Sequence, residues 1–188
     1  HLNSTLFLDQ LNMSEKSIDT EASAEVAGNL QAISERVKFA HEGYAGASPT
    51  LVAVSKRQPD NRIEAALLAG QRVFGENRVQ EAQRRWAKRR GLYPDLRLHL
   101  IGPLQTNKAA DAVALFDVIE VVDRPKLARG LSNEMARQGR HLPCYVQVNT
   151  GEEDQKSGIL PDEADSFIGF CREAVSYTHL RAHETHSN

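Results

Sequence analysis

Short apolar runs recur along this chain at nearly even intervals, and that rhythm restricts the fold more than any other sequence feature. The runs begin at residues 51, 73, 96, 117 and 144, and helical segments fill the intervals between them. Strands that alternate with helices in this way are typical of right-handed βαβ units, which build a parallel sheet. A further helix is expected over residues 24–45, where Val26, Leu30 and Val37 lie on one apolar face.

Two parallel architectures fit such a rhythm: an open doubly wound sheet and a (β/α)8 barrel. No Gly-rich dinucleotide fingerprint follows any of the strands, which argues against the first. Polar residues also alternate with apolar ones, since His99 lies between leucines and Val146 and Val148 alternate with Gln147 and Asn149. An inner barrel face that becomes polar near its mouth explains this alternation. The sequence therefore predicts an incomplete (β/α)8 TIM barrel with about five of its eight strands.

Lys56 ends the first apolar run, Leu51–Lys56, at the carboxyl end of the predicted strand. Parallel α/β folds place their chemistry at that end of the strands. Burial disfavours a charged ammonium, and a neutral amine can attack a carbonyl carbon. Lys56 is therefore a candidate Schiff-base lysine. The alternative is an ordinary strand-end lysine that reaches solvent.

Composition narrows the classes of partner. The 188 residues carry a formal net charge of −2 at pH 7, which gives no general case for nucleic acid or acidic lipid. No stretch approaches the ~20 apolar residues of a membrane span, so no membrane partner is expected. Cys144 and Cys171 lie in a predicted strand and a predicted helix. They are expected to be buried free thiols in the cytoplasm, with neither a disulfide framework nor a metal site.

The helix predicted from Asn77 to Arg90 is rich in basic residues, which raises nucleic-acid or phosphate binding as an alternative. Its other side carries Val79, Ala82 and Trp86, so the basic side chains are expected to form a solvent face. No aromatic residues are interleaved for stacking on bases. No nucleic-acid partner is therefore expected. The basic residues are Arg78, Arg84, Arg85, Lys88, Arg89 and Arg90.

Four motifs together carry a family resemblance. AVSK ends at Lys56, FGEN at 74–77 is followed by VQEA, HLIGPLQTNK occupies 99–108, and QVN at 147–149 is followed by KSG. In this order and at these spacings they resemble the pyridoxal-phosphate homeostasis protein family (YggS/PROSC type). The resemblance extends over about residues 24–174.

The resemblance implies an alanine-racemase-like barrel of the third PLP fold type, with pyridoxal 5'-phosphate (PLP) held as a Schiff base on Lys56. It also implies a monomeric protein that carries or buffers PLP in vitamin B6 and amino-acid homeostasis, without established catalysis. PLP-dependent apoenzymes would be its transient recipients. A Ser/Gly-rich phosphate loop and an arginine facing the pyridine nitrogen are expected beyond this sequence. The alternatives are a PLP-dependent amino-acid racemase and a cofactor-free Schiff-base aldolase.

Four further residues are candidate cofactor contacts, each with an alternative explanation. Asn77 is expected either to bond a cofactor oxygen or to cap the helix that it starts. His99 is placed near the pyridine ring, or is an inner-barrel histidine with its own partner. Gln147 and Asn149 are expected at the barrel mouth, where an inner hydrogen-bond network explains them nearly as well.

Two more polar groups invite a binding hypothesis. Gln105, Asn107 and Lys108 open a βα segment that would suit an anion, although helix capping and a solvated lysine are slightly preferred. Lys156 is a possible second Schiff-base lysine, although a solvated loop is the favoured interpretation. None of these is placed in the principal site.

The two ends are expected to lie outside the barrel. Residues 1–23 are predicted to be a disordered or non-native leader, with Met13 as the true start, and 24–174 to be the partial PLP-binding barrel. From Val175 the sequence resembles a translated sequencing adapter. Residues 175–188 are therefore predicted to be a non-native tail that adds no strand, and no metal site is expected at its histidines. These histidines are His179, His183 and His186.

Overall fold

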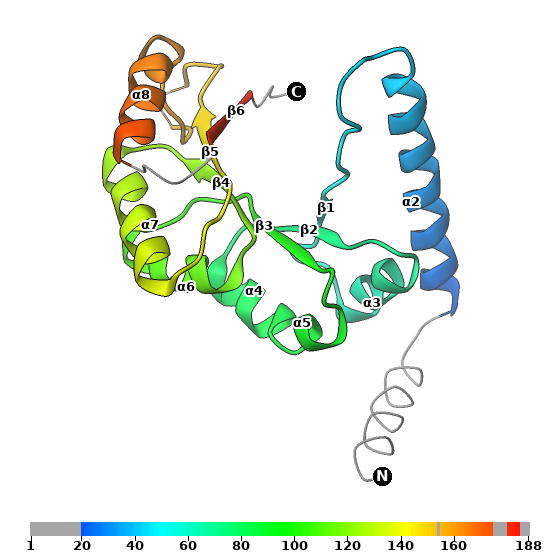
Figure 1. Ribbon diagram of the computed structural model, residues 1–188. Coiled ribbons are helices and arrows are strands. Elements are labelled where there is room, and N and C mark those ends of the chain that lie inside the picture. The colour runs from blue at the N-terminus through cyan, green and yellow to red at the C-terminus, as the bar shows by residue number, and fades with distance from the viewer. Residues whose placement is uncertain (1–19, 154, 175–179, 185–188) are drawn as a thin grey trace. The chain divides into compact units, whose positions relative to one another are not determined.

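The computed structural model describes residues 20–153, 155–174 and 180–184, without the side chains of Thr20 and of 180–184 (Figure 1). It divides into two compact units, one ending at Arg72 and the other beginning at Val73. Each unit is described by itself. The expected leader, 1–23, lies mostly outside the described residues, but its last four residues already belong to a helix.

Unit 1 contains α2 (Thr20–His41), β1 (Ala53–Val54) and α3 (Asp60–Leu68). α2 packs against α3, and Arg62 Nη2 lies 3.1 Å from Glu25 Oε1 across this contact. The buried side of α3 is formed by Ile63, Ala65, Ala66 and Leu67. The first strand is therefore present, although it is shorter than the apolar run that predicts it.

The apolar face predicted on α2 is covered unevenly. Val26 is buried, whereas Leu30 and Val37 are only partly buried. Helical periodicity was sufficient to predict the helix. It does not say which part of the face has a partner, because packing depends on neighbours far away in the sequence.

Unit 2 is a succession of βα segments. Its first half comprises β2 (Val73–Glu76), α4 (Val79–Trp86), α5 (Arg89–Leu92), β3 (Arg97–Leu100), η1 (Thr106–Lys108) and α6 (Ala109–Leu115). Its second half comprises β4 (Val118–Val122), α7 (Pro125–Gln138), β5 (Cys144–Val148), η2 (Pro161–Glu163), α8 (Ala164–Ala174) and β6 (Leu180–Glu184).

The strands of unit 2 pair in parallel in the order β2-β3-β4-β5-β6. Figure 1 shows α4, α5, α6 and α7 on the same side of this sheet. Leu98 and Leu100 are fully buried, whereas His99 between them is only partly buried. Helices on one face and polar positions on the other are the arrangement of a partial (β/α)8 barrel, as the sequence predicts.

The last strand, β6, corrects a prediction. Residues 175–188 were expected to add no strand, yet Leu180–Glu184 pairs in parallel with β5. The physical reason is that an edge strand presents unpaired N–H and C=O groups, which a further extended segment can satisfy. Residues 175–179 and 185–188, including His179 and His186, lie outside the described residues.

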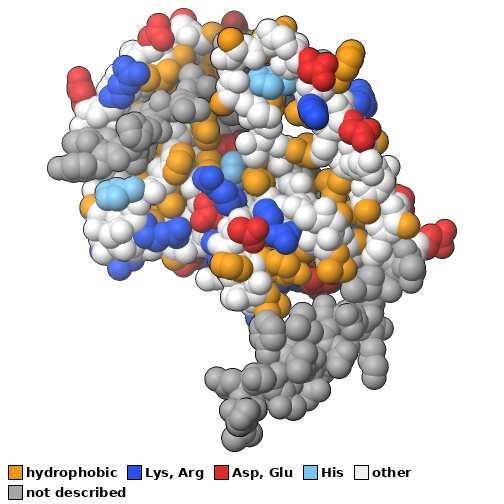
Figure 2. All heavy atoms as spheres, turned by 45° about the vertical axis from the view of Figure 1, so that its right-hand side comes forward, with side chains coloured by type: hydrophobic (Ala, Val, Ile, Leu, Met, Phe, Trp, Pro, Cys, Tyr) orange, Lys and Arg blue, Asp and Glu red, His pale blue; other side chains and the backbone are white. Residues whose placement is uncertain are grey.

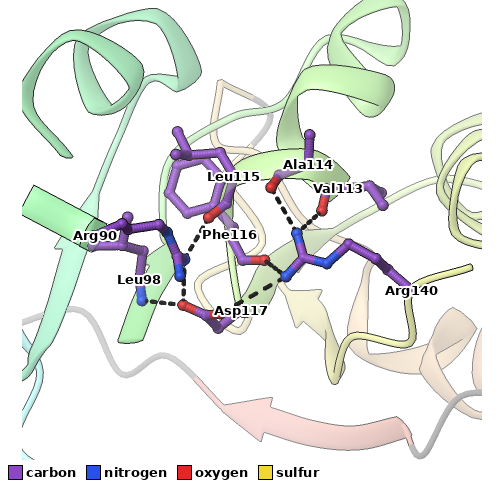
Figure 3. A network of polar contacts seen from close by, with 8 residues as sticks. All are labelled: Arg90, Leu98, Val113, Ala114, Leu115, Phe116, Asp117 and Arg140. Atoms are coloured by element: carbon purple, nitrogen blue, oxygen red, sulfur yellow. Dashed lines mark hydrogen bonds and ion pairs between the residues drawn. The ribbon is translucent and has the colours of Figure 1, made fainter. Parts of the chain in front are cut away.

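A network of arginines and one carboxylate joins the end of α6 to the start of β4 (Figure 3). Asp117 Oδ2 accepts hydrogen bonds from Arg90 Nη2 at 2.6 Å and from the Leu98 N–H at 2.7 Å. Arg140 Nη2 lies 3.8 Å from Asp117 Oδ1. The two guanidinium groups also donate to the carbonyls of Val113, Ala114, Leu115 and Phe116. The free carbonyls at the end of α6 are thereby capped.

Candidate functional site

Lys56 lies in a tight turn that follows β1. The Gln58 N–H donates to the Ser55 carbonyl at 3.1 Å, and Arg57 adopts a left-handed φ of 59°. This turn leaves Ser55 buried and exposes Lys56. The expected burial of Lys56 is therefore wrong in this structure. The strand ends one residue before Ser55, so the turn carries the lysine outward.

In unit 2 the loops that follow β2 and β3 enclose a pocket of about 490 Å³. A Cβ on Gly102 would lie 2.5 Å from the Asn77 carbonyl oxygen, so only glycine allows the two loops to approach this closely. The pocket therefore lies at the carboxyl ends of neighbouring strands, where the sequence places the site. Its lining residues are Asn77, Arg78, Val79, Gln80, Pro103, Leu104, Gln105 and Lys108.

One wall of this pocket is fixed by a buried carboxylate that sequence analysis did not assign. Glu76 is fully buried at the end of β2, and its Oε1 accepts from Trp86 Nε1 at 2.8 Å and from Arg85 Nη1 at 3.0 Å. Both donors belong to the α4 segment, so the pair holds α4 against β2. A carboxylate within an apolar strand was the available signal, because such a group is buried only with partners.

Arg124 holds the other wall of the pocket, a role that was not predicted from the sequence. Its Nη2 donates to the Leu104 carbonyl at 2.7 Å and lies 3.4 Å from Thr106 Oγ1, while Nη1 lies 2.5 Å from Asp123 Oδ1. The loop from 103 to 106 is thus tied to the residue that precedes α7. A guanidinium suits this task because its fork of donors reaches several acceptors at once.

His99 pairs with Glu120 on the sheet face away from the helices. Nδ1 of His99 lies 2.5 Å from Oε1 of Glu120 on the neighbouring strand β4, and both side chains are mostly buried. A carboxylate that accepts at Nδ1 orients the ring and leaves Nε2 available to another group. His99 was a sequence candidate and Glu120 was not, because the pairing depends on the β3–β4 register.

Gln147 and Asn149 hold a loop at the end of β5. Gln147 Nε2 donates to the Ser157 carbonyl at 3.2 Å, and Asn149 Nδ2 donates to the Glu153 carbonyl at 2.9 Å. This supports the hydrogen-bond network that was their alternative explanation. In the same loop Lys156 Nζ lies 2.6 Å from Glu153 Oε1, and this contact lowers the pKa of Glu153.

The candidate residues are therefore only partly brought together. Asn77 lines the pocket, whereas His99, Gln147 and Asn149 do not. Lys56 belongs to unit 1 and the other four belong to unit 2. Their assignment as cofactor contacts stays a prediction.

The basic helix is used mostly for structure. Arg85 pairs with Glu76, Arg90 pairs with Asp117, and Arg89 donates to the Arg85 carbonyl at 2.6 Å. The expectation of a solvent face is therefore wrong for these arginines. The remaining members, Arg78, Arg84 and Lys88, are exposed. Figure 2 shows Lys and Arg side chains interspersed with Asp and Glu among the coloured residues of its face.

The two cysteines are free and buried, as predicted. Burial raises the pKa of Cys144 to about 12 and that of Cys171 to about 11. Both thiols are therefore poor nucleophiles at neutral pH. Within the described residues, no group of three or more His, Cys, Asp or Glu side chains is placed to hold a metal ion. Across that same part of the chain, every helix is too short or too polar to cross a membrane.

Curated relatives support the motif-based resemblance. The pyridoxal phosphate homeostasis protein of Vibrio cholerae is 40% identical over 139 residues, and that of Vibrio alginolyticus is 35% identical over 144 residues. These matches cover 72% and 74% of this chain, but only 59% and 62% of the relatives. The chain thus spans about three fifths of the length of these relatives.

Solved structures agree with the fold. PipY of Synechococcus elongatus without PLP is 35% identical, with a TM-score of 0.72, over 83% of this chain and 68% of PipY. PipY with PLP bound is 34% identical, with a TM-score of 0.70, over the same shares of the two chains. An alanine racemase from Clostridium difficile shares the fold at 15% identity and a TM-score of 0.55, over 72% of this chain and 35% of the racemase.

A family model extends the comparison almost to the end of the chain. The alanine racemase N-terminal domain model matches residues 28–187. With such a match over most of its length, and with pyridoxal phosphate homeostasis proteins among its relatives, the chain belongs to the alanine racemase N-terminal domain family.

Proposed function

We propose that this protein binds PLP and carries or buffers it, with the aldehyde held as a Schiff base on Lys56. The observation that carries the proposal is the similarity to PipY, which is 34% identical over 83% of this chain and was solved with PLP bound. Relatives named as pyridoxal phosphate homeostasis proteins support the same role. The activity and partners of the whole protein belong to this proposal.

The surroundings of Lys56 fit an aldehyde cofactor. Its side chain is exposed, and its amine makes no hydrogen bond or ion pair with any residue in the described part of the chain. The turn that follows β1 fixes the backbone on both sides of it. PLP, when bound, would supply an aldehyde carbon, and the neutral form of an accessible amine on a fixed turn can attack such a carbon with release of water.

Four unit 2 residues are proposed as cofactor contacts. Asn77 presents a side-chain amide in the pocket, and His99, oriented by Glu120, presents Nε2. Gln147 and Asn149 each use an amide nitrogen on the loop after β5, which leaves their side-chain oxygens as acceptors. Their contribution to binding is therefore expected to be smaller than that of Asn77 and His99.

We propose carrying rather than catalysis, because racemisation needs acid–base groups on both faces of the substrate α-carbon. His99 Nδ1 and Glu120 Oε1 lie 2.5 Å apart on neighbouring strands, so this pair supplies acid–base groups on one side only. Apoenzymes that require PLP are the proposed recipients, and the carrier is proposed to act as a monomer in the cytoplasm. Chiral analysis after incubation with L-alanine should show no turnover near the ~10 per second of typical enzymes.

Reduction with borohydride tests the lysine. After incubation with PLP and reduction, peptide mapping should find the pyridoxyl group on Lys56, and Lys56→Ala should lose the visible absorbance of the complex. Lys126→Ala is the matched control, since Lys126 is an exposed lysine on α7. Undiminished absorbance and affinity in Lys56→Ala would show that another amine holds the cofactor.

A further inference from the structure

The pocket between the loops that follow β2 and β3 is lined by basic and amide side chains that are not needed to hold the two loops together. Arg78 enters from the β2 side and Lys108 from the β3 side, and no carboxylate is among the lining residues. The amides of Asn77, Gln80 and Gln105 complete its polar part. A pocket lined by two cations and three amides on opposite walls offers hydrogen-bond donors to an anion.

These polar groups have little else to bind within the described residues. Arg78 Nη1 lies 3.4 Å from Glu81 Oε1, and Lys108 Nζ lies 3.6 Å from Asp111 Oδ2, both as single contacts one helical turn apart. Exposed pairs of this kind contribute little to stability and are easily exchanged. The three amide side chains make no hydrogen bond with another described residue. Their donors are therefore available to a ligand.

The walls of the pocket, in contrast, are held firmly. The buried Glu76 anchors the β2 side through Trp86, and Arg124 ties the Leu104 carbonyl on the β3 side. Gly102 keeps the two loops in backbone contact. A preformed pocket binds a ligand at lower entropic cost than a mobile one.

We propose that this pocket is a second binding site, which takes a small phosphate monoester without a bond to Lys56 and shares only Asn77 with the proposed PLP contacts. The phosphate would lie between Arg78 and Lys108, where charge-assisted hydrogen bonds are strongest. Val79, Pro103 and Leu104 form an apolar surface for the rest of the ligand. The volume of about 490 Å³ falls within the range of small-molecule sites.

Phenyl phosphate is a suitable probe, because it has a phosphate monoester and an apolar ring but no aldehyde for a lysine. Calorimetric titration should show binding of phenyl phosphate, weaker binding of inorganic phosphate and none of phenol. Arg78→Gln and Lys108→Gln should each weaken phenyl phosphate binding by about tenfold. Higher salt should weaken binding by the unchanged protein as well.

Matched controls separate this site from general charge effects. Arg84→Gln on α4 and Lys126→Gln on α7 remove exposed cations outside the pocket and should leave phenyl phosphate affinity unchanged. Circular dichroism should confirm that all four variants fold. Equal losses in pocket and control variants would overturn the proposal, as would an absence of phenyl phosphate binding.

A variant at the proposed carrier lysine distinguishes this proposal from the previous one. Lys56→Ala should keep its affinity for phenyl phosphate even if it loses PLP. If Lys56→Ala abolishes phenyl phosphate binding, the pocket serves the cofactor held at Lys56 and is not an independent site. Failure of PLP to label Lys56 would refute the carrier proposal and leave this result intact.

Discussion

The strands of the unit 2 sheet begin at one end of the sheet, here called the amino edge, and finish at the other, here called the carboxyl edge. Both edges carry basic residues, but these residues have opposite roles. At the amino edge, Arg90 and Arg140 share Asp117 and donate to four carbonyls that end α6 (Figure 3). At the carboxyl edge, Arg78 and Lys108 each make one exposed contact at 3.4 or 3.6 Å. The cations at the amino edge share a carboxylate and several carbonyl acceptors, whereas each cation at the carboxyl edge has one exposed acceptor.

The difference shows that basic residues alone do not reveal a binding surface. Six cations crowd one stretch of sequence, yet Arg85, Arg89 and Arg90 act as structural braces. Among the described residues, Arg78 differs from them because its acceptor, Glu81, is exposed, whereas theirs are buried or partly buried. A binding group is recognised by its unused donors, and a structural one by the acceptors that it satisfies.

The largest effect is expected when the amino edge loses its carboxylate. Asp117→Ala removes the shared partner of Arg90 and Arg140 and the acceptor of the Leu98 N–H. Leaving two partly buried cations without their anion should lower the free energy of unfolding by about 2–3 kcal/mol. Urea unfolding measures this change.

The matched control lies at the carboxyl edge. Asp111→Ala removes the exposed partner of Lys108 and should change the free energy of unfolding by less than about 0.5 kcal/mol. Equal destabilisation by the two aspartate variants would show that the edges do not differ in the way described.

The next effect concerns the close approach of the two pocket loops. In Gly102→Ala the new methyl group would meet the Asn77 backbone, so the loops must separate, at about 2 kcal/mol of stability. Gly91→Ala, with open space around it in α5, should instead be neutral or stabilising by up to about 1 kcal/mol. Thermal unfolding of both variants tests the prediction, and a neutral Gly102→Ala would contradict it.

A smaller effect is expected at the end of β5. Asn149→Ala loses the partly buried bond to the Glu153 carbonyl and should cost about 1 kcal/mol. Gln147→Ala loses an exposed bond to Ser157 and should cost less than about 0.5 kcal/mol. If the two variants unfold at the same urea concentration, Asn149 does not hold the loop.

The smallest effect is the change of stability with pH that arises from the buried thiol of Cys144. Burial raises the pKa of Cys144 from 9.0 to about 12, so the folded state keeps a proton that the unfolded state loses. This contribution to stability is therefore fully present well below pH 9.0, begins to be lost as pH approaches 9.0, and continues to fall as pH rises toward 12. Between pH 7 and pH 9 the loss should be about 0.4 kcal/mol. Cys144→Ala should remove this contribution, and an identical pH slope in both proteins would refute it.

Local patterns were sufficient for most of the fold. Apolar runs bounded by proline and glycine predicted β1 to β5, and the alternation around His99 predicted which face is polar. These features depend on residues close together in sequence. β6 could not be predicted in the same way, because its pairing with β5 depends on the unpaired edge of a strand formed more than thirty residues earlier.

The site was predicted less well, because its details depend on distant partners. The pairing of His99 with Glu120 requires the β3–β4 register, and the hold of Arg124 on Leu104 requires the path of a loop. The turn at Arg57 exposes Lys56, and a left-handed arginine has no sequence signal. Glu76 is the exception, since a carboxylate within an apolar strand was visible from the start.

The bond between Trp86 and Glu76 has a consequence for spectroscopy. Trp86 is the only tryptophan of the chain; it is fully buried, and its ring centroid lies 4.6 Å from that of Phe74. Its fluorescence therefore reports the joint between β2 and α4, and with it one wall of the pocket. An unfolding curve followed by tryptophan emission describes unit 2 alone. The melting of α2 and α3 would need a backbone signal such as circular dichroism to be seen.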